Sequence, residues 1–372
     1  MLVGVPKEIK NHEYRVGMTP TSVREMIKNG HSVIVETNAG VGISASDDSY
    51  RAAGAEILDT ADEIFAKADM IVKVKEPQAI ERAMLREGQI LYTYLHLAPD
   101  PEQTKDLVNS GATCVAYETV TSRFGGLPLL APMSKVAGRM AVQAGAYCLE
   151  HPHGGLGMLL GGVPGVDPAK VVVLGAGVVG THSTHIAVGM GADVWVLDNN
   201  ADALDRHWQH FGRGTNTVFS TADALEKHVL EADLVIGGVL VPGAEAPKLV
   251  TKEMVAQMKP GSVIVDVAID QGGCCETSHA TTHAEPTYTV NDVVHYCVAN
   301  MPGGVPRTST YALNNVTLPF AIQLANKGAK QALMDDEHLR NGLNVHAGKV
   351  TYRPVAEELG YDYVSAEDAF NQ

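Results

Sequence analysis

The stretch Val171-Val-Val-Leu-Gly-Ala-Gly-Val-Val-Gly180, followed by Trp195-Val-Leu-Asp198, decides the fold of this chain. The apolar run predicts a buried strand, and the spacing G-x-G-x-x-G, at Gly175, Gly177 and Gly180, predicts a tight turn that opens a helix. The first glycine permits the turn, the second lets a pyrophosphate approach the backbone, and the third lets helix and strand pack closely. The N–H groups at the start of the helix then point at the phosphates. The stretch therefore predicts a βαβ unit that binds a dinucleotide.

Asp198 supports this prediction and indicates which dinucleotide binds. It ends the second strand about 20 residues after the glycines, where the fingerprint requires an acceptor for the ribose hydroxyls. A carboxylate would repel a ribose 2′-phosphate, and neither Asn199 nor Asn200 offsets it with an arginine. The sequence therefore favours NAD over NADP.

The composition is that of a globular protein with room for two domains. The chain has 372 residues, of which 45% are hydrophobic and 19% are charged, and this length suits two domains of ordinary size. Its 28 basic and 43 acidic side chains give a net charge of −15. This excess of negative charge argues against nucleic acid or an anionic membrane as a partner.

The N-terminus and the cysteines predict a cytoplasmic protein. Residues 1–7 begin with a strand-like run and lack the architecture of a signal peptide, and no apolar run is long enough to span a bilayer. The 5 cysteines are odd in number and show no C-x-x-C spacing, so we expect reduced thiols. We predict no metal site. The histidine pairs His182/His185 and His207/His210, each three apart on a predicted helix, are expected to face solvent.

Short strand-like runs alternate with helical ones on both sides of the glycine motif. This alternation predicts an α/β fold with parallel sheets covered on both faces. Long helices are expected from Ser134 to Glu150 and from Thr308 onward, where Pro319 would kink or end the second helix. The other predicted strands are Leu2–Val5, His31–Glu36, Met70–Val74, Ile90–Leu95, Thr113–Tyr117, Ala232–Gly237, Ser262–Ala268 and Thr287–Val290.

The order of these elements predicts two Rossmann-like domains, one inserted into the other. We expect residues 129–307 to form the NAD-binding domain. Residues 1–128 and 308–372 would then form a discontinuous substrate domain, which is also α/β but lacks a phosphate-binding glycine motif.

Four polar side chains stand out by their position in the chain. Lys75, His96 and Asp270 each follow an apolar strand at its carboxyl end, where open parallel sheets bind ligands, and Arg15 lies soon after the first strand. A cleft between two α/β domains could bring them together. A guanidinium and an ammonium would hold a substrate carboxylate, and an imidazole would exchange protons at neutral pH.

Each of these residues also has a simpler interpretation. Arg15 could form a surface ion pair with Glu13, Lys75 could be a strand-end lysine that faces water, and His96 could be an ordinary surface or core histidine. Asp270 could be a turn former before the glycines that follow it. None of the four is persuasive alone.

Read together, the motifs resemble those of the alanine dehydrogenase family, and the resemblance covers nearly the whole chain. It implies NAD-dependent, reversible oxidative deamination of L-alanine to pyruvate and ammonia, in a cytoplasmic homohexamer. So many separated matches in the same order are highly specific. The motifs are Val5–Asn11, Arg15-Val, Lys73–Pro77, Tyr94–Leu97, Tyr117–Val120, Leu129–Ser134, Gly161–Gly165, Val241–Ala244, Asp266–Gly273 and Val298–Pro302.

The resemblance implies roles for individual residues. Arg15 and Lys75 match binders of the substrate carboxylate, and His96 and Asp270 match the two acid/base residues. The cofactor contacts that it implies, beyond the three glycines, are Ser134, Val178, Val179, Asp198, Ser220, Val239, Leu240, Val267, Ala268, Ile269, Asp270, Val298, Ala299, Asn300 and Met301.

Three other functions stay open at this point. The first is the nucleotide-binding module of a proton-translocating transhydrogenase, which resembles this family in fold and N-terminal motif but has no substrate for His96, Lys75 and Asp270 to serve. The second is a related dehydrogenase that condenses a keto acid with a larger amine. The third is a non-catalytic NAD sensor, which needs no polar cluster at the cofactor.

Overall fold

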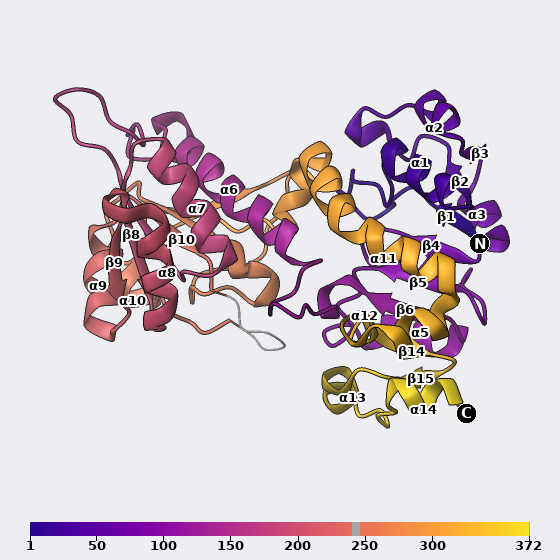
Figure 1. Ribbon diagram of the computed structural model, residues 1–372. Helices are drawn as coiled ribbons and strands as arrows, with labels where there is room; N and C mark the ends of the chain where they lie inside the picture. The colour runs from indigo at the N-terminus through magenta and orange to yellow at the C-terminus, as the bar shows by residue number, and fades with distance from the viewer. Residues whose placement is uncertain (240–245, 372) are drawn as a thin grey trace. The chain divides into compact units, whose positions relative to one another are not determined.

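The computed structural model describes residues 1–239 and 246–371, which form two compact α/β units (Figure 1). Met1–Met133 and Gly303–Gln372 make up one unit, here called the two-segment unit. Ser134–Pro302 make up the other, here called the inserted unit. The predicted fold class is confirmed, because each unit has a mostly parallel sheet and one unit interrupts the chain of the other.

The two-segment unit has an eight-stranded sheet in the order β15-β14-β6-β5-β4-β1-β2-β3. Pairing is parallel from β6 through β3, and β14 and β15 join antiparallel at one edge. The strands are β1 Leu2–Val5, β2 Ser32–Glu36, β3 Glu56–Leu58, β4 Met70–Val72, β5 Ile90–Thr93, β6 Thr113–Ala116, β14 Leu343–His346 and β15 Lys349–Val350. The helices are α1 Pro20–Lys28, α2 Asp47–Ala53, α3 Ala61–Lys67, α4 Ala79–Arg82, α5 Pro101–Ser110, α11 Pro306–Asp335, α12 Glu337–Arg340, α13 Arg353–Leu359 and α14 Ala366–Asn371, with 3-10 turns η1 Val41–Ile43 and η2 Tyr117–Thr119.

The inserted unit has a seven-stranded sheet in the order β12-β13-β11-β10-β7-β8-β9, and only β12 pairs antiparallel among these strands. The strands are β7 Lys170–Leu174, β8 Asp193–Asp198, β9 Asn216–Phe219, β10 Leu234–Gly237, β11 Val263–Asp266, β12 Thr287–Val290 and β13 Val293–Tyr296. The helices are α6 Ala131–Cys148, α7 Val178–Gly189, α8 Ala201–Phe211, α9 Ala222–Glu231 and α10 Lys252–Val255, with 3-10 turns η3 His151–His153, η4 Gly212–Gly214, η5 Val267–Gln271 and η6 Met301–Gly304.

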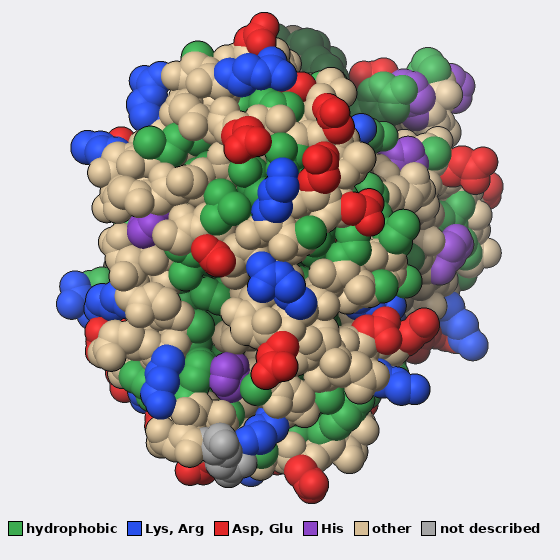
Figure 2. All heavy atoms as spheres, turned by 90° about the vertical axis from the view of Figure 1, so that its right-hand side faces the viewer, with side chains coloured by type: hydrophobic (Ala, Val, Ile, Leu, Met, Phe, Trp, Pro, Cys, Tyr) green, Lys and Arg blue, Asp and Glu red, His purple; other side chains and the backbone are tan. Residues whose placement is uncertain are grey.

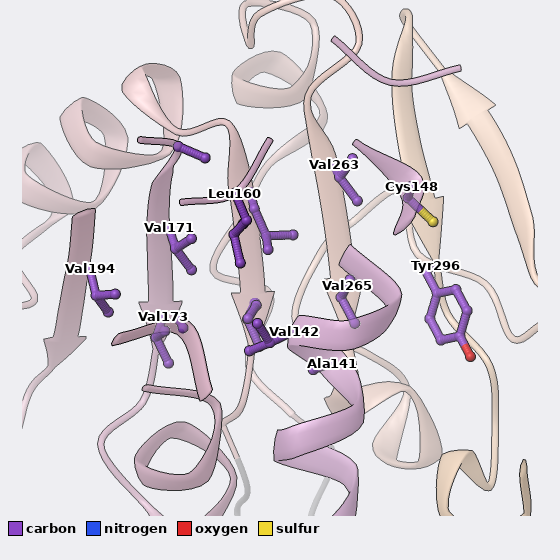
Figure 3. Packing of buried hydrophobic residues seen from close by; sticks show 14 of the residues in the cluster. Ala141, Val142, Cys148, Leu160, Val171, Val173, Val194, Val263, Val265 and Tyr296 are labelled. Atoms are coloured by element: carbon purple, nitrogen blue, oxygen red, sulfur yellow. The ribbon is translucent and has the colours of Figure 1, made fainter. Parts of the chain in front are cut away.

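The unbroken apolar run of β7 is explained by burial on both faces of the sheet. Val171 and Val173 pack into a core that includes Ala141 and Val142 of α6 (Figure 3). The alternate residues Val172 and Leu174 belong to a second core on the other face, with side chains of α9. Each buried side chain of this size contributes about 1.5–3 kcal/mol, so both layers of helices hold the central strand in place.

Two expectations about helices are wrong. The helix after Thr308 does not end at Pro319: α11 continues to Asp335, and its one residue with non-helical dihedrals is Gly328, at φ 73°. Buried side chains on both sides of the proline keep that helix packed despite the missing hydrogen bond. The histidine pairs do not all face solvent either, because His207 of α8 is 3% exposed.

The thiols fit the sequence-based expectation, and the surface carries charges of both signs (Figure 2). No helix among the described residues is long and apolar enough to cross a membrane. All five cysteines are buried and free, as predicted for reduced thiols. On the face in Figure 2, acidic and basic side chains are interspersed.

Candidate active site

The glycine turn of the inserted unit forms an anion cradle at the N-terminus of α7. Gly175 adopts φ 99°, and its N–H donates to the Leu197 carbonyl at 2.7 Å. A Cβ on Gly180 would lie 1.7 Å from the Gly175 oxygen, so only glycine fits there. A Cβ on Gly177 would meet nothing within 4 Å. The protein itself leaves that space open, and a pyrophosphate would fill it.

Asp198 lies beside this cradle at the end of β8. Its carboxylate accepts hydrogen bonds from the Ala176 N–H at 2.7 Å and from the Asn200 N–H at 2.8 Å. The Ser220 N–H donates to the Asp198 carbonyl at 3.0 Å, which ties the end of β9 to the same place. The acidic side chain is thus fixed against the glycine turn, where a ribose diol would reach it.

The other predicted cofactor residues of the inserted unit follow strands at the same edge of the sheet. Val178 and Val179 begin α7, Val239 follows β10, residues 267–270 form η5 after β11, and residues 298–301 follow β13. Ser134 lies in α6. Leu240 lies outside the described residues. The structure therefore brings four strand ends of one parallel sheet together around the cradle.

A buried carboxylate, Asp266, holds the turn that carries Asp270. It accepts hydrogen bonds from the Ala268 N–H at 3.1 Å, the Cys274 N–H at 2.9 Å and the Ser278 hydroxyl at 2.6 Å. Both ends of the turn are thereby tied to one side chain. Asp270 in turn accepts the N–H of Asn300 at 3.3 Å, which links the turn to the segment after β13.

Asp266, Cys274 and Cys275 are close enough to hold a metal ion, since their ligand atoms lie within 4.8 Å of one another. The carboxylate already accepts hydrogen bonds from the chain, including one from the Cys275 N–H at 3.2 Å. The Cys275 thiol, together with burial, raises the pKa of Cys274 well above its usual range. Because the Asp266 oxygens already accept several hydrogen bonds from the chain, this group fits a hydrogen-bonded core.

Arg15 of the two-segment unit is a buried cation, with only 2% of the residue exposed. Its Nε and Nη2 both donate to the Glu13 carboxylate at 2.6 Å, and Nη1 lies 3.0 Å from the Met133 sulfur. Burial opposes the charge, but the hydrogen bonds and charge of Glu13 outweigh it and raise the pKa of Arg15. The ion pair with Glu13 therefore exists, but it is not on the surface.

Lys75 follows β4, and Lys73, two residues earlier, belongs to a buried network of ion pairs. The Lys73 ammonium lies 3.0 Å from the Glu8 carboxylate and 2.6 Å from that of Glu81, and all three side chains are at most 2% exposed. Burial opposes the charge on Lys73, but the two carboxylates raise its pKa. Glu8 also accepts the N–H of Val74 at 2.7 Å, which fixes the backbone just before Lys75. The Lys75 side chain is 14% exposed, so it is not a lysine that simply faces water.

His96 follows β5 and has the left-handed backbone angle φ 51°, which is uncommon for a residue other than glycine. Its ring stacks on Tyr94 with centroids 5.8 Å apart and planes 6° apart. The Tyr94 hydroxyl donates to the Leu129 carbonyl at 2.6 Å. Glu118, in the turn after β6, accepts the His96 N–H at 2.6 Å.

The structure groups the predicted residues by unit. Arg15, Lys75 and His96 follow β1, β4 and β5, which are neighbours in one sheet, while Asp270 and the predicted cofactor residues belong to the inserted unit. Three carboxylates that hold these residues had no role predicted from the sequence, namely Glu8, Glu118 and Asp266. Glu118 could have been recognised from the sequence in the same way as His96, because both follow a strand at its carboxyl end.

A glycine-lined helix N-terminus beside an acidic strand end, in a doubly wound sheet, defines a dinucleotide-binding protein of the Rossmann class. Residues 4–137 match the family model "Alanine dehydrogenase/PNT, N-terminal domain", and residues 141–353 match "Alanine dehydrogenase/PNT, C-terminal domain". The chain therefore belongs to the alanine dehydrogenase/PNT family, and the resemblance inferred from its motifs is confirmed.

Individual relatives match over nearly the full length. The alanine dehydrogenase of Halomonas elongata is 60% identical over 366 residues, which are 98% of this chain and 99% of that protein. A solved structure of an L-alanine dehydrogenase is 51% identical with a TM-score of 0.94, over 97% of this chain and 99% of that one. A transhydrogenase structure from Sinorhizobium meliloti is 28% identical with a TM-score of 0.81, over 95% and 99% of the two chains.

Proposed function

We propose that this chain catalyses the NAD-dependent, reversible oxidative deamination of L-alanine to pyruvate and ammonia. Its similarity to alanine dehydrogenases over the whole chain supports this activity. The observation that carries the proposal is the placement of Arg15, Lys75 and His96 after three neighbouring strands of one sheet. Two cations and an imidazole in that arrangement suit a small substrate with a carboxylate and a group that gains or loses protons.

Arg15 and Lys75 would bind the carboxylate of alanine or pyruvate. Glu13 binds one edge of the Arg15 guanidinium through Nε and Nη2, so the cation is held in place. Lys75 supplies a second positive charge from the next strand end. Fixing the carboxylate at two points orients the rest of a small substrate, and such positioning supplies several kcal/mol of a reaction barrier.

The inserted unit would hold NAD, because the open space at Gly177, the N-terminus of α7 and the Asp198 carboxylate match a pyrophosphate and a ribose diol. When bound, NAD supplies the acceptor for the hydride that leaves the substrate Cα. The Asp198 carboxylate disfavours a 2′-phosphate at the same place. The segments at 267–270 and 298–301 would line the nicotinamide side of the cofactor.

His96 and Asp270 would handle the protons. Water must add to the oxidised substrate before ammonia leaves, and both steps move protons on and off its oxygen and nitrogen. The His96 imidazole would exchange these protons, because an imidazole can both accept and donate a proton. The Asp270 carboxylate would orient the water and favour positive charge on the substrate nitrogen.

Turnover of pyruvate and ammonium with NADH tests the proposal directly. We expect NADH oxidation that requires both pyruvate and ammonium, and the variants His96→Ala and Asp270→Asn should each lower kcat at least about a hundredfold, in the range typical of acid/base residues. NADH binding, followed by its fluorescence, should stay within about threefold in both variants because the cradle is unchanged. Near-normal turnover in either variant would remove that residue from the mechanism.

The same assay separates the alternatives. A transhydrogenase module would instead transfer hydride between NADH and an oxidised cofactor analogue, without pyruvate or ammonium. A dehydrogenase for larger amines would turn over pyruvate with an amino acid in place of ammonium, and an NAD sensor would turn over neither. A cytoplasmic homohexamer is part of the proposal, and light scattering of the purified protein would measure the number of subunits.

A further inference from the structure

Glu118 is a largely buried carboxylate that faces His96 from a neighbouring strand end. It lies in η2 directly after β6, and β6 pairs with β5, which leads to His96. Its side chain is 12% exposed, and one carboxylate oxygen lies 3.9 Å from the His96 Nδ1. Few carboxylates are buried to this extent without a structural or chemical role.

The first contact of Glu118 is with the backbone of the His96 turn. Its Oε1 accepts the His96 N–H at 2.6 Å, and both oxygens lie 3.2 Å from the Leu95 nitrogen, whose N–H they accept. His96 has the left-handed φ of 51°, which a side chain other than glycine adopts at a cost. Two backbone N–H groups that donate to a charged acceptor here offset that cost. They also fix the backbone of His96 and hence the orientation of its side chain.

The second contact is between the carboxylate and the imidazole edge. Nδ1 lies 3.9 Å from the Glu118 Oε1, so Nε2 is the ring nitrogen at the opposite edge of the imidazole. Three other titratable groups lie near the pair. Tyr94 stacks on the imidazole, Tyr352 interacts with Glu118, and Arg15 interacts with Tyr94. Among these neighbours, Glu118 is the one whose negative charge lies next to the imidazole.

We propose that Glu118 is the positioning residue for His96: it holds the imidazole in the left-handed turn with Nε2 presented to the substrate, and its charge stabilises the protonated ring. This inference rests on the proposed function, in which His96 exchanges protons with the substrate. When His96 takes a proton from the substrate, positive charge develops 3.9 Å from a fixed carboxylate. The protonated intermediate is stabilised without any movement of the protein.

Two variants separate the two contributions of Glu118. Glu118→Gln keeps an oxygen that can accept the His96 N–H but removes the charge. Glu118→Ala removes both. Glu102→Gln is the matched control, because Glu102 is an exposed carboxylate of the same unit in the first turn of α5.

The effect of the Glu118 charge is tested by two measurements, the acylation of His96 and the pH dependence of kcat/KM. Diethyl pyrocarbonate acylates neutral imidazole, so peptide mass spectrometry across a pH series gives the midpoint of His96 titration without any enzyme activity. In Glu118→Gln we expect this midpoint to move to lower pH, because the negative charge 3.9 Å from the imidazole is removed. The acid limb of kcat/KM for alanine oxidation should move the same way by the same amount, because the neutral imidazole is the base. Glu102→Gln should move neither.

The backbone contribution is tested by turnover at each variant's own optimum pH. Glu118→Gln should keep kcat within about threefold of wild type, whereas Glu118→Ala should lose at least about tenfold in kcat with the KM for pyruvate changed less than about threefold. An unmoved His96 midpoint in Glu118→Gln, or full kcat in Glu118→Ala, would overturn the proposal. If the wild-type protein does not turn over pyruvate and ammonium, the proposed function fails, while the acylation midpoints still decide whether Glu118 acts on His96.

Discussion

The two units place their candidate residues by different physical means on similar sheets. In the inserted unit, the backbone forms most of the site: a glycine turn, the N-terminus of α7 and short segments after parallel strands. In the two-segment unit, side chains form the site, and buried carboxylates hold them: Glu13 binds Arg15 directly, and Glu8 and Glu118 bind the backbone beside Lys75 and at His96. The proposed cofactor cradle is thus built from local geometry. The proposed substrate site depends on buried carboxylates, two of which come from distant segments of the chain.

The contrast explains why the two sites differ in sensitivity. A backbone cradle fails when a side chain is added, because there is no space for it. A site of paired buried charges fails when one partner is removed, because the other charge is left without compensation. Substitutions in the two units should therefore produce different losses, and the following experiments measure them.

The largest effect is expected from Gly180→Ala in the inserted unit. The added Cβ would lie 1.7 Å from the Gly175 oxygen, so the turn or the helix must shift. We expect the free energy of unfolding to fall by about 3 kcal/mol or more, with NADH affinity reduced at least about tenfold. Urea denaturation and fluorescence titration with NADH measure the two losses.

Gly189→Ala is the control, in the same helix. A Cβ there would meet nothing within 4 Å, and its φ lies outside the left-handed range. Alanine should therefore leave stability unchanged or raise it by about 0.5–1 kcal/mol. Equal losses in the two variants would show that α7 tolerates no substitution, and would remove the argument for a specific contact at Gly180.

These two glycines also show how much of the molecule the sequence could predict. The strand Lys170–Leu174 and the turn after it were predictable because an apolar run and a glycine spacing encode them within a few residues. β1 was predicted with its observed bounds, and the predictions for β2, β4, β5 and β6 agree to within two residues at each end, whereas the short strand β3 was not predicted. Local patterns therefore fix many of the elements and the cradle.

What could not be predicted depends on packing between distant segments. His207 has the spacing of a solvent-facing histidine, but its burial is set by the elements packed around α8. The pair of Arg15 with Glu13 was a visible alternative in the sequence, yet only the fold, which brings Met133 over it, makes it a buried pair. Glu118 lies 22 residues from His96, so its role is visible only once β5 and β6 pair.

The second largest effect is expected from Glu13→Gln in the two-segment unit. The amide cannot neutralise the Arg15 guanidinium, which stays buried and loses its charged partner. Breaking one side of a buried pair costs about 3–5 kcal/mol, and urea denaturation should show a loss of this order. The KM for pyruvate should rise as well, because the arginine is no longer held in place.

The exposed pair of Glu25 with Lys28 supplies the comparison. These side chains are 43% and 74% exposed and lie 3.8 Å apart. Glu25→Gln should change the free energy of unfolding by less than about 0.5 kcal/mol. If Glu13→Gln lowers the free energy of unfolding no more than Glu25→Gln does, the buried carboxylate does not stabilise the two-segment unit as proposed.

A third effect, dependent on pH, is expected at His207 in the inserted unit. Burial lowers the pKa of His207 to about 4 in the folded protein, against an ordinary value of 6.5. Between these two pH values the unfolded chain binds a proton that the folded one does not, so stability is lost as pH falls from about 6.5 to about 4. The loss reaches at most about 3 kcal/mol. His207→Gln should make the free energy of unfolding less dependent on pH in this window than in wild type.

His151→Gln, at an exposed position of η3 in the same unit, is the control and should keep the wild-type slope. Urea denaturation at a series of pH values between 4 and 7 compares the three proteins. If His207→Gln loses stability with falling pH as steeply as wild type, the histidine is not the group that titrates.

The smallest effect is expected from Asp198→Asn, which tests a side chain in the unit where the backbone dominates. The amide keeps an oxygen for the Ala176 N–H, which Asp198 accepts at 2.7 Å, so the turn should stay intact. The charge that repels a 2′-phosphate is removed, and the ratio of kcat/KM for NADH over NADPH should fall about tenfold, or about 1.4 kcal/mol. Asp193→Asn, at the other end of β8, removes the same charge away from the cradle and should leave the ratio unchanged. If wild type and both variants have the same ratio of kcat/KM for NADH over NADPH, the backbone alone selects the cofactor. The inserted unit would then use no side chain for this selection, in contrast to the two-segment unit.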